Sequence, residues 1–351
     1  GPVNRNRSDI RNAFAAPERN PGARRAKRSR LGAALAASAA ALAAAAVYNA
    51  YRAREAERGH PPAGRFVTVD GVRLHYLEWG EGPPVVLLHG NVVTADDFEL
   101  SGIPRLLAGR HRVVAFDRPG FGYSDRPKGK AWTAARQAGL LRRAFARLGI
   151  ERPVVAGHSW GTLVALELAL RYPDAVDGLV LLGGYYHPTM RADVPLFSPP
   201  AIPVIGTVLC HTVSPLLGTA MLPLAFKAMF SPRPVPERFA RDFPRGLSVR
   251  PSQVRAEAQD TATMIPAAAA LRHRFGELRM PVTIMAGTAD RVVDVEAHAA
   301  RLHDEIPHSV LRLVAGAGHM VHHAAPEQVA EAVEAVFDRA RSARGRRQVP
   351  A

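Results

Sequence analysis

The chain has 351 residues, enough for one large domain with extra segments, and a formal net charge of +15. The positive charge lies at the two ends, since residues 1–60 hold 12 Lys or Arg against 4 Asp or Glu and residues 339–351 hold 5 Arg and no acid. The near-neutral centre, without any zinc-type or nucleic-acid motif, argues against a nucleic-acid-binding protein, and the single Cys210 excludes an intramolecular disulfide.

The basic N-terminal tail, residues 1–30, is polar and rich in Arg, and we expect it to be disordered. Residues 31–51 then carry no charge, and as a helix they would extend roughly 31 Å, about the thickness of the hydrocarbon core of a bilayer. We predict a single membrane-anchor helix over residues 31–51. The greater number of basic residues before it favours a cytoplasmic N-terminus, with the remainder of the chain extracytoplasmic.

Alanine leaves other interpretations of this segment open. Eleven of residues 33–46 are Ala, which forms helices but contributes little hydrophobicity. A cleaved secretory signal and an Ala-rich soluble helix of a cytoplasmic protein are the alternatives to an anchor. Residues 52–64 are expected to be a linker to the folded part.

The pattern after residue 64 alternates between strands and helices. Two strands, at residues 66–69 and 72–79, flank the turn signal Asp70-Gly71. Further strands are predicted at residues 84–88, 112–116, 153–157, 179–182, 282–286 and 310–314, with helices at 98–107, 132–148 and 161–171. An antiparallel start followed by strand–helix units predicts a largely parallel sheet covered on both faces, with functional residues beyond the carboxyl ends of the strands.

A long interruption separates the predicted strands at residues 179–182 and 282–286, far longer than an ordinary loop. We therefore divide the folded part into a first core segment at residues 65–183, a lid at 184–265 and a second core segment at 266–340, followed by a basic tail at 341–351. The first half of the lid, residues 194–230, is apolar. This indicates either an apolar pocket beneath the lid or a core within the lid itself.

The most specific motif is Gly157-His158-Ser159-Trp160-Gly161, which lies between a predicted strand and a predicted helix. A sharp strand-to-helix turn exposes its central residue, and small residues two positions away let the strand and the helix pass closely. The N-terminus of the helix favours negative charge beside the serine. Ser159 is therefore the candidate nucleophile.

Two further residues follow predicted strands at the same edge of the sheet. Asp290 comes after residues 282–286, and His319 comes after residues 310–314 in the flexible run Ala315-Gly316-Ala317-Gly318. A serine hydroxyl needs a histidine to take its proton and a carboxylate to orient that histidine. The chain order Ser159, Asp290, His319 is the order found in α/β-hydrolases.

Other acids and histidines compete for these roles. Asp294 is the rival acid, although its spacing favours capping of the helix that follows. The competing bases are His89, His158, His322 and His323. We expect His158 to point away from the serine, and His322 and His323 to serve surface or packing roles.

Five segments together resemble the α/β-hydrolase fold family from about residue 66 to residue 337. They are Leu87-Leu88-His89-Gly90-Asn91, Asp117-Arg118-Pro119-Gly120-Phe121-Gly122-Tyr123-Ser124, Gly157-His158-Ser159-Trp160-Gly161, Gly287-Thr288-Ala289-Asp290 and Gly316-Ala317-Gly318-His319. The resemblance implies an α/β-hydrolase fold with a helical lid inserted after the sixth strand and a Ser-Asp-His triad, without a cofactor or a metal. It also implies an oxyanion hole formed by the backbone N–H groups of Asn91 and Trp160, each contributing roughly 3 kcal/mol.

Ser159 distinguishes the chain from relatives with an aspartate nucleophile. Haloalkane dehalogenases resemble it at Asn91 and Trp160, whose side chains match their halide-binding pair, but they carry Asp where this chain has Ser159. A serine that attacked an alkyl halide would form an ether, which water does not readily cleave, whereas an acyl ester can be hydrolysed. We therefore expect a carboxylic ester hydrolase that acts on a hydrophobic small molecule. The alternatives are a cofactor-free haloperoxidase or perhydrolase, a C–C bond hydrolase, and a non-catalytic receptor.

Overall fold

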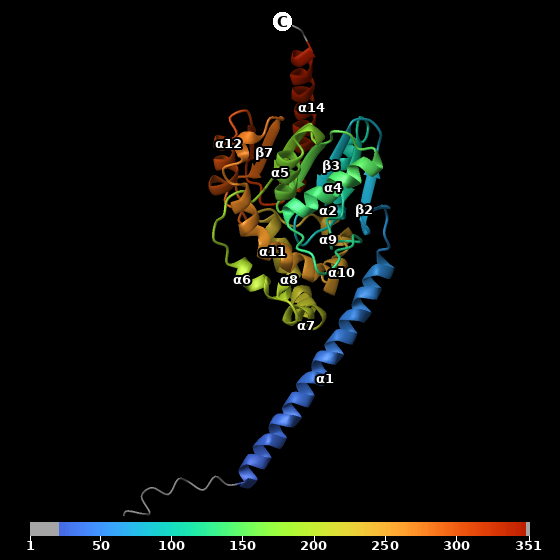
Figure 1. The fold of residues 1–351 in the computed structure, drawn as a ribbon, viewed down its shortest axis with the longest axis vertical. Coiled ribbons are helices and arrows are strands. Elements are labelled where there is room, and N and C mark those ends of the chain that lie inside the picture. Colours follow the sequence, from blue (N-terminus) through green and yellow to red (C-terminus); the bar gives the residue numbers. More distant parts are fainter. Residues whose placement is uncertain (1–20, 349–351) are drawn as a thin grey trace, which may run out of the picture. The chain divides into compact units, whose positions relative to one another are not determined.

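The computed structural model describes residues 21–348, which divide after Val47 into a helical N-terminal unit and a globular unit that begins at Tyr48 (Figure 1). Helix α1, Pro21–Gly59, belongs to both units. It begins inside the predicted tail and continues into the predicted linker, because the Arg and Ala residues on both sides of residues 31–51, and the Glu residues after them, are strong helix formers. The tail prediction for residues 1–20 falls outside the described residues.

The globular unit is built on an eight-stranded sheet that confirms the predicted α/β class. The strand order is β1-β2-β4-β3-β5-β6-β7-β8, with β2 antiparallel to both neighbours and every other pair parallel. Each strand lies within one residue of its predicted position. The bounds are β1 Arg65–Val69, β2 Val72–Trp79, β3 Pro84–Leu88, β4 Arg112–Phe116, β5 Val154–His158, β6 Gly178–Leu182, β7 Val282–Gly287 and β8 Val310–Val314.

Both faces of the sheet are buried under helices. Alternate residues of β3 serve opposite faces, since Val86 and Leu88 belong to one core cluster while Val85 and Leu87 belong to the other. The first face packs against α4 Ala134–Leu148, α5 Gly161–Arg171 and α12 Arg301–Glu305, with the π-helical turn η5 Glu296–Ala300 before α12. The second face packs against α2 Ala95–Ser101, α3 Ile103–Leu107, α13 Val321–Ala324 and α14 Pro326–Gln348. The single helix predicted at residues 98–107 is thus two, divided at Gly102, whose φ is 84°.

The segment between β6 and β7 is helical. Its helices are α6 Asp193–Phe197, α7 Ile205–His211, α8 Val213–Phe230, α9 Glu237–Asp242, α10 Arg245–Ser248 and α11 Pro251–Leu271. The expected lid boundary at residue 265 falls inside α11, which is continuous through Pro266. Likewise, α14 continues through the expected tail boundary at residue 341 as far as Gln348. Neither expected boundary therefore coincides with the end of a helix.

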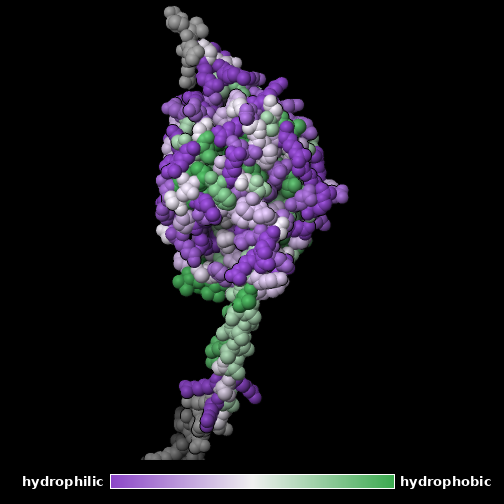
Figure 2. Space-filling view, turned by 90° about the vertical axis from the view of Figure 1, so that its right-hand side faces the viewer, coloured by the Kyte–Doolittle hydropathy of each residue, from purple (hydrophilic) through white to green (hydrophobic). Residues whose placement is uncertain are grey.

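The face of the globular unit drawn in Figure 2 is mostly hydrophilic, but strongly hydrophobic residues gather at its lower end, where Figure 1 shows α7 and α8. Two helical stretches among the described residues, Arg25–Gly59 and Val213–Phe230, are long and apolar enough to cross a bilayer, judged by length and composition alone. The second of these is α8, which packs partly inside the globular unit through residues such as Phe226 and Phe230.

Candidate active site

Ser159 lies in a strained turn between β5 and α5. Its φ is 50°, in the left-handed region that non-glycine residues rarely adopt. The two flanking glycines make this turn sterically feasible, because a Cβ atom at Gly157 would lie 2.7 Å from the carbonyl oxygen of Gly161, and one at Gly161 would lie 2.2 Å from that of Leu88. The Ser159 backbone N–H donates to the carbonyl oxygen of Leu182 at 2.9 Å, which fixes the turn to the end of β6.

The loop after β3 passes directly beside this turn. A Cβ atom at Gly90 would lie 3.0 Å from the Cβ of Ser159, so a glycine is needed for the approach. Asn91 follows in the chain, and Trp160 follows Ser159. Among residues 21–348, neither the Asn91 nor the Trp160 backbone N–H donates to a protein acceptor. Two donors near the serine are therefore available to a bound oxygen atom.

His319 and Asp290 are joined at the ends of β8 and β7. Nδ1 of His319 donates to Oδ2 of Asp290 at 2.9 Å, and both side chains are buried. The other carboxylate oxygen accepts from the backbone N–H groups of Val292 and Val293 at 2.8 and 3.0 Å. Burial works to raise the pKa of Asp290, but His319 and these N–H groups outweigh it and lower the pKa below its usual range. Asp290 is thus held as a carboxylate that orients the imidazole.

Asp294 lies away from this pair. Its carboxylate accepts from the backbone N–H of Ala297 at 2.7 Å, at the start of the helical turn that contains η5, and it is exposed to solvent. This is the capping contact expected from its spacing.

The competing histidines are buried around the site. Nε2 of His158 hydrogen-bonds to the carbonyl oxygen of His319 at 3.0 Å, and the two rings lie 4.8 Å apart. His158 thus supports the backbone of His319 through a hydrogen bond, a role that its place in the sequence motif does not indicate. His89 accepts from the backbone N–H of Arg118 at 3.0 Å, and burial lowers its pKa to about 4, so it is neutral.

His322 and His323 pack rather than face solvent. Their Nε2 atoms each lie 2.6 Å from an oxygen of the buried Asp97. The three ligand atoms lie within 4.8 Å of one another, a spacing that could hold a metal ion. Burial acts to raise the pKa of Asp97, yet the two histidines hold it well below its usual range. The hydrogen bonds within the cluster account for the carboxylate and one nitrogen of each ring, so packing explains all three residues.

Ser159 and His319 line one cavity of about 660 Å³, within the usual range for small-molecule sites. Most of the wall comes from apolar residues of α6, α8 and α11, together with Val92 and Val293 from the core. The charged lining residues are few. Arg191 forms two hydrogen bonds to the carboxylate of Asp193, each 2.9 Å long, and burial raises the pKa of Glu257 to about 8. The wall of the cavity is therefore close to neutral at pH 7.

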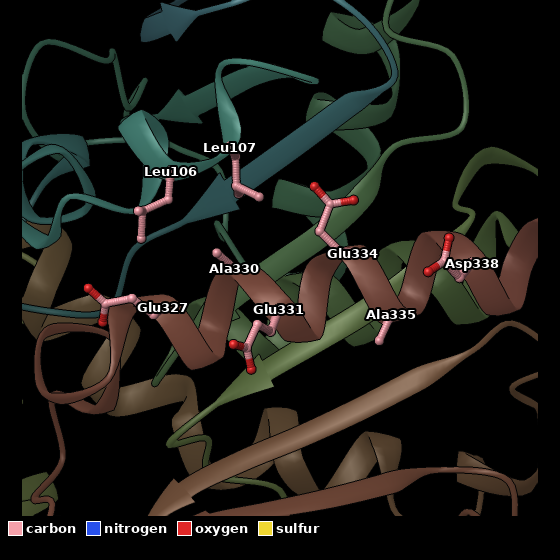
Figure 3. Close-up of a pocket in the computed structure, with 8 residues that line it drawn as sticks. All are labelled: Leu106, Leu107, Glu327, Ala330, Glu331, Glu334, Ala335 and Asp338. Carbon is pink, nitrogen blue, oxygen red and sulfur yellow. The ribbon is translucent and has the colours of Figure 1, made fainter.

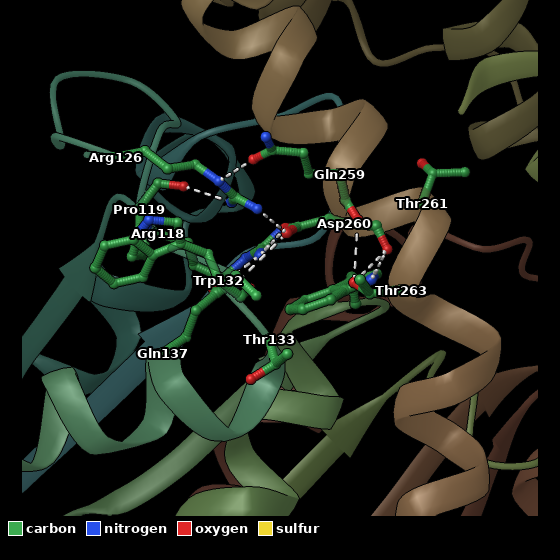
Figure 4. Close-up of polar contacts among 12 residues, drawn as sticks. Arg118, Pro119, Arg126, Trp132, Thr133, Gln137, Gln259, Asp260, Thr261 and Thr263 are labelled. Carbon is green, nitrogen blue, oxygen red and sulfur yellow. Dashed lines mark hydrogen bonds and ion pairs between the residues drawn. The ribbon is translucent and has the colours of Figure 1, made fainter. Parts of the chain in front are cut away.

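Helix α11 is fixed to the core by buried charges (Figure 4). Asp260 accepts from Arg118 at 2.6 Å through one carboxylate oxygen and from Arg126 at 2.9 Å through the other. The indole N–H of Trp160 donates to the backbone carbonyl of Asp260 at 2.9 Å, while the side-chain amide of Asn91 accepts from Arg118 and donates to Thr261. The sequence suggested Asn91, Trp160 and the glycine-rich run that contains Arg118, whereas Asp260 lies in an otherwise ordinary helix and carried no such signal.

A second depression lies between α3 and α14, where Glu327, Glu331, Glu334 and Asp338 surround Leu106 and Leu107 (Figure 3). It is open to solvent and shares no lining residue with the cavity at Ser159. Glu334 is paired with His111 at 2.9 Å. None of its described lining residues is a Ser, Cys or His.

The alpha/beta hydrolase fold family matches residues 83–326, more than half of the chain, and the protein belongs to this family. A 2-hydroxy-6-oxo-2,4-heptadienoate hydrolase from Pseudomonas putida is 31% identical over 271 residues, which cover 74% of this chain and 90% of the relative. Haloalkane dehalogenase 2 from Mycobacterium tuberculosis is 28% identical over 285 residues, covering 78% and 94%.

A solved structure of a bacterial membrane phospholipase A has a TM-score of 0.61 to this chain at 24% identity, and the match covers 90% of this chain and 99% of that one. The similarity supports the fold. The predicted membership of the α/β-hydrolases is therefore confirmed, and the two named sequence relatives are enzymes.

Proposed function

We propose that the protein is a serine hydrolase that cleaves neutral, hydrophobic carboxylic esters through an acyl-enzyme intermediate. The observation that carries this proposal is the strained Ser159 at the wall of an apolar cavity that His319, hydrogen-bonded to Asp290, also lines. These three residues are the proposed triad. The N–H groups of Asn91 and Trp160 are the proposed oxyanion hole.

The reaction follows from these roles. Oγ of Ser159 attacks the acyl carbon while Nε2 of His319 takes the hydroxyl proton, and the two N–H groups stabilise the oxyanion that forms. The C–O bond to the alcohol breaks, and His319 returns the proton to that leaving oxygen. Water, deprotonated by His319, then attacks the acyl-serine, releasing the acid and regenerating Ser159. No cofactor enters these steps.

Two features argue against dehalogenation, the activity named for one relative. The nucleophile is a serine, which would form an ether with an alkyl halide. In addition, the single indole N–H of Trp160, one of the two residues that resemble a halide-binding pair, is occupied by the backbone oxygen of Asp260. A halide would have to displace this contact.

Cleavage of a carbon–carbon bond, suggested by the Pseudomonas putida relative, is less well supported than ester hydrolysis. An anionic dienoate needs a free cation in the pocket. Among the described residues that line the cavity, Arg191 is the sole Arg or Lys, and Asp193 already neutralises it. The near-neutral wall favours an uncharged ester.

A chain-length series of p-nitrophenyl esters tests the proposal, together with labelling by a fluorophosphonate. We expect turnover and covalent labelling at Ser159 in the full-length protein, and for Ser159→Ala a loss of roughly 10⁴ to 10⁶ in kcat with no labelling. Labelling of another serine in the variant would refute the assignment. A folded wild-type protein that neither turns over any ester nor reacts with the probe would instead indicate a receptor.

A further inference from the structure

The first half of the inserted segment exposes an unusual amount of apolar surface. Residues 194–230 contain no Asp, Glu or Arg and a single Lys, Lys227. Many of their large side chains face solvent, and the exposed fraction reaches 79% for Val204, 67% for Leu224 and 65% for Leu196. Single exposed hydrophobic residues are ordinary, but a continuous group of them marks a surface that meets another apolar phase.

The same residues form the mouth of the cavity. Leu196, Val213, Leu217 and Leu224 are all exposed to solvent and also line the cavity that contains Ser159. An apolar molecule that enters across this surface would therefore reach the serine without passing a charged rim. A polar substrate would not be stabilised by contacts with this apolar entrance.

The C-terminal part of α1 is fixed at this surface. The side-chain amide of the buried Asn49 donates to the carbonyl oxygens of His211 and Thr212, at 2.9 and 2.7 Å, at the junction of α7 and α8. Farther along the helix, Glu57 pairs with Arg250 at 2.9 Å. The chain that leads into Asn49 is the uncharged stretch of residues 31–47. The segment best suited to enter a bilayer is thus joined to the globular unit at the apolar mouth of its cavity.

We propose that the exposed face of α6, α7 and α8 is a membrane-docking surface through which ester lipids leave the bilayer and enter the cavity at Ser159. The inference rests on the proposed hydrolase function for the reaction, but the docking itself does not depend on catalysis. The bilayer is the occupant because residues 194–230 contain no acidic residue, because the face opens into the apolar cavity, and because Asn49, which closely follows the uncharged stretch in the chain, is bound at the junction of α7 and α8.

The test compares two double variants of the full-length protein, reconstituted with vesicles of phosphatidylcholine and phosphatidylglycerol. Ile205→Glu/Val208→Glu places two charges on the exposed side of α7, at residues that do not line the cavity. Leu106→Glu/Leu313→Glu is the matched control, since both leucines are similarly exposed but lie elsewhere on the globular unit. Each protein is assayed with soluble p-nitrophenyl butyrate and with a long-chain lipid ester embedded in the vesicles.

We expect Ile205→Glu/Val208→Glu to hydrolyse the soluble ester at the wild-type rate. The rate on the embedded ester should fall at least roughly tenfold, because the strength of attachment to an interface scales with the apolar area that is buried. The control should match the wild type on both substrates. Equal rates of the docking variant and the wild type on the embedded ester would overturn the proposal. So would an equal loss on both esters, since that indicates a damaged cavity.

A fluorophore attached at Ile205→Cys gives a readout that is independent of activity. We expect nitroxide-labelled lipids in the same vesicles to quench it, and not to quench a fluorophore at Leu106→Cys. If the wild type cleaves no ester while the quenching is observed, the proposed reaction fails and the docking surface stands. Absence of quenching refutes the docking. Burial of the fluorophore against a second copy of the chain before lipid is added also refutes it, because the surface would then be an interface between copies.

Discussion

At the scale of single residues, the distinction between Asp290 and Asp294 is the sharpest test of the proposed chemistry. Asp290→Asn should leave the protein folded and lower kcat by roughly 10⁴, because an amide favours the wrong tautomer of His319. Asp294→Asn should cost little, since its carboxylate only caps a helical turn. Steady-state kinetics of both variants decide the matter, and a reversed pair of results would make Asp294 the acid.

We predict from the ionisation of Glu257 that activity decreases at alkaline pH. Its pKa is raised by burial from 4.5 to about 8, so its carboxyl is neutral at pH 7 and becomes charged in the cavity wall above about pH 8. We expect the rate with apolar esters to fall as pH rises through that value, and Glu257→Gln to abolish the fall. A pH profile that is identical in the variant and the wild type would exclude this role.

The same group links stability to pH. Because the folded-state pKa lies above the unfolded value, the folded protein binds more protons than the unfolded chain between pH 4.5 and about 8, and this contribution to stability is lost as pH rises through that window. Denaturation midpoints should therefore fall less steeply with pH in Glu257→Gln than in the wild type. Glu331→Gln, at an exposed residue of α14, provides the control.

At the scale of elements, α11 is held by a buried carboxylate between two arginines. Asp260→Ala would leave Arg118 and Arg126 buried without their partner, which we expect to cost about 3–5 kcal/mol in the free energy of unfolding. Asp242→Asn, at an exposed carboxylate that pairs only with the neighbouring Arg241, should leave the denaturation midpoint unchanged. Urea titrations of both variants measure the difference, and equal midpoints would show that the buried cluster does not stabilise α11.

The sequence predicted the sheet well because its central strands are short, largely apolar runs that end in recognisable turns. The same local patterns identified Ser159, Asp290 and His319 as candidates. The contacts of α11 could not be predicted from the sequence. Asp260 and Arg118 are 142 positions apart in the chain, and no local motif links them. Helices α1 and α14 extend beyond the boundaries expected from the change in charge, because the charged residues there are themselves good helix formers.

At the scale of the whole molecule, the central prediction is that residues 31–51 anchor the protein as one helix. The uncharged stretch is Ala-rich, so insertion is supported by few strongly apolar residues, and the basic ends add attraction to anionic headgroups of about 1 kcal/mol per residue near the surface. We expect the full-length protein to remain in the membrane pellet after alkaline carbonate extraction. A chain that begins at Tyr48 keeps the contacts of Asn49 and Glu57, and should be released or bind only peripherally.

The fractionation has three other possible outcomes, and each supports a different interpretation of residues 31–51. Full-length protein in the soluble fraction at low salt would refute the anchor and favour a soluble helix. Release at high salt or high pH alone would indicate a peripheral, electrostatic association. Absence of residues 31–51 from the mature protein would identify a cleaved signal.

The unequal attachment of α11 and α6–α8 has a consequence for how the proposed hydrolase can diversify. The indole of Trp160 and the side chain of Asn91 both contact α11, so this helix is a structural part of the reaction centre and must be inherited with it. Met229 contacts the loop of His319, since its carbonyl oxygen accepts from the backbone N–H of Met320 at 3.3 Å, whereas residues 193–225 meet that centre as the wall of the cavity. Exchange of this stretch between homologues should transfer the preference for acyl-chain length as a module while the chemistry stays constant, whereas exchange of residues 251–271 should yield inactive chimaeras.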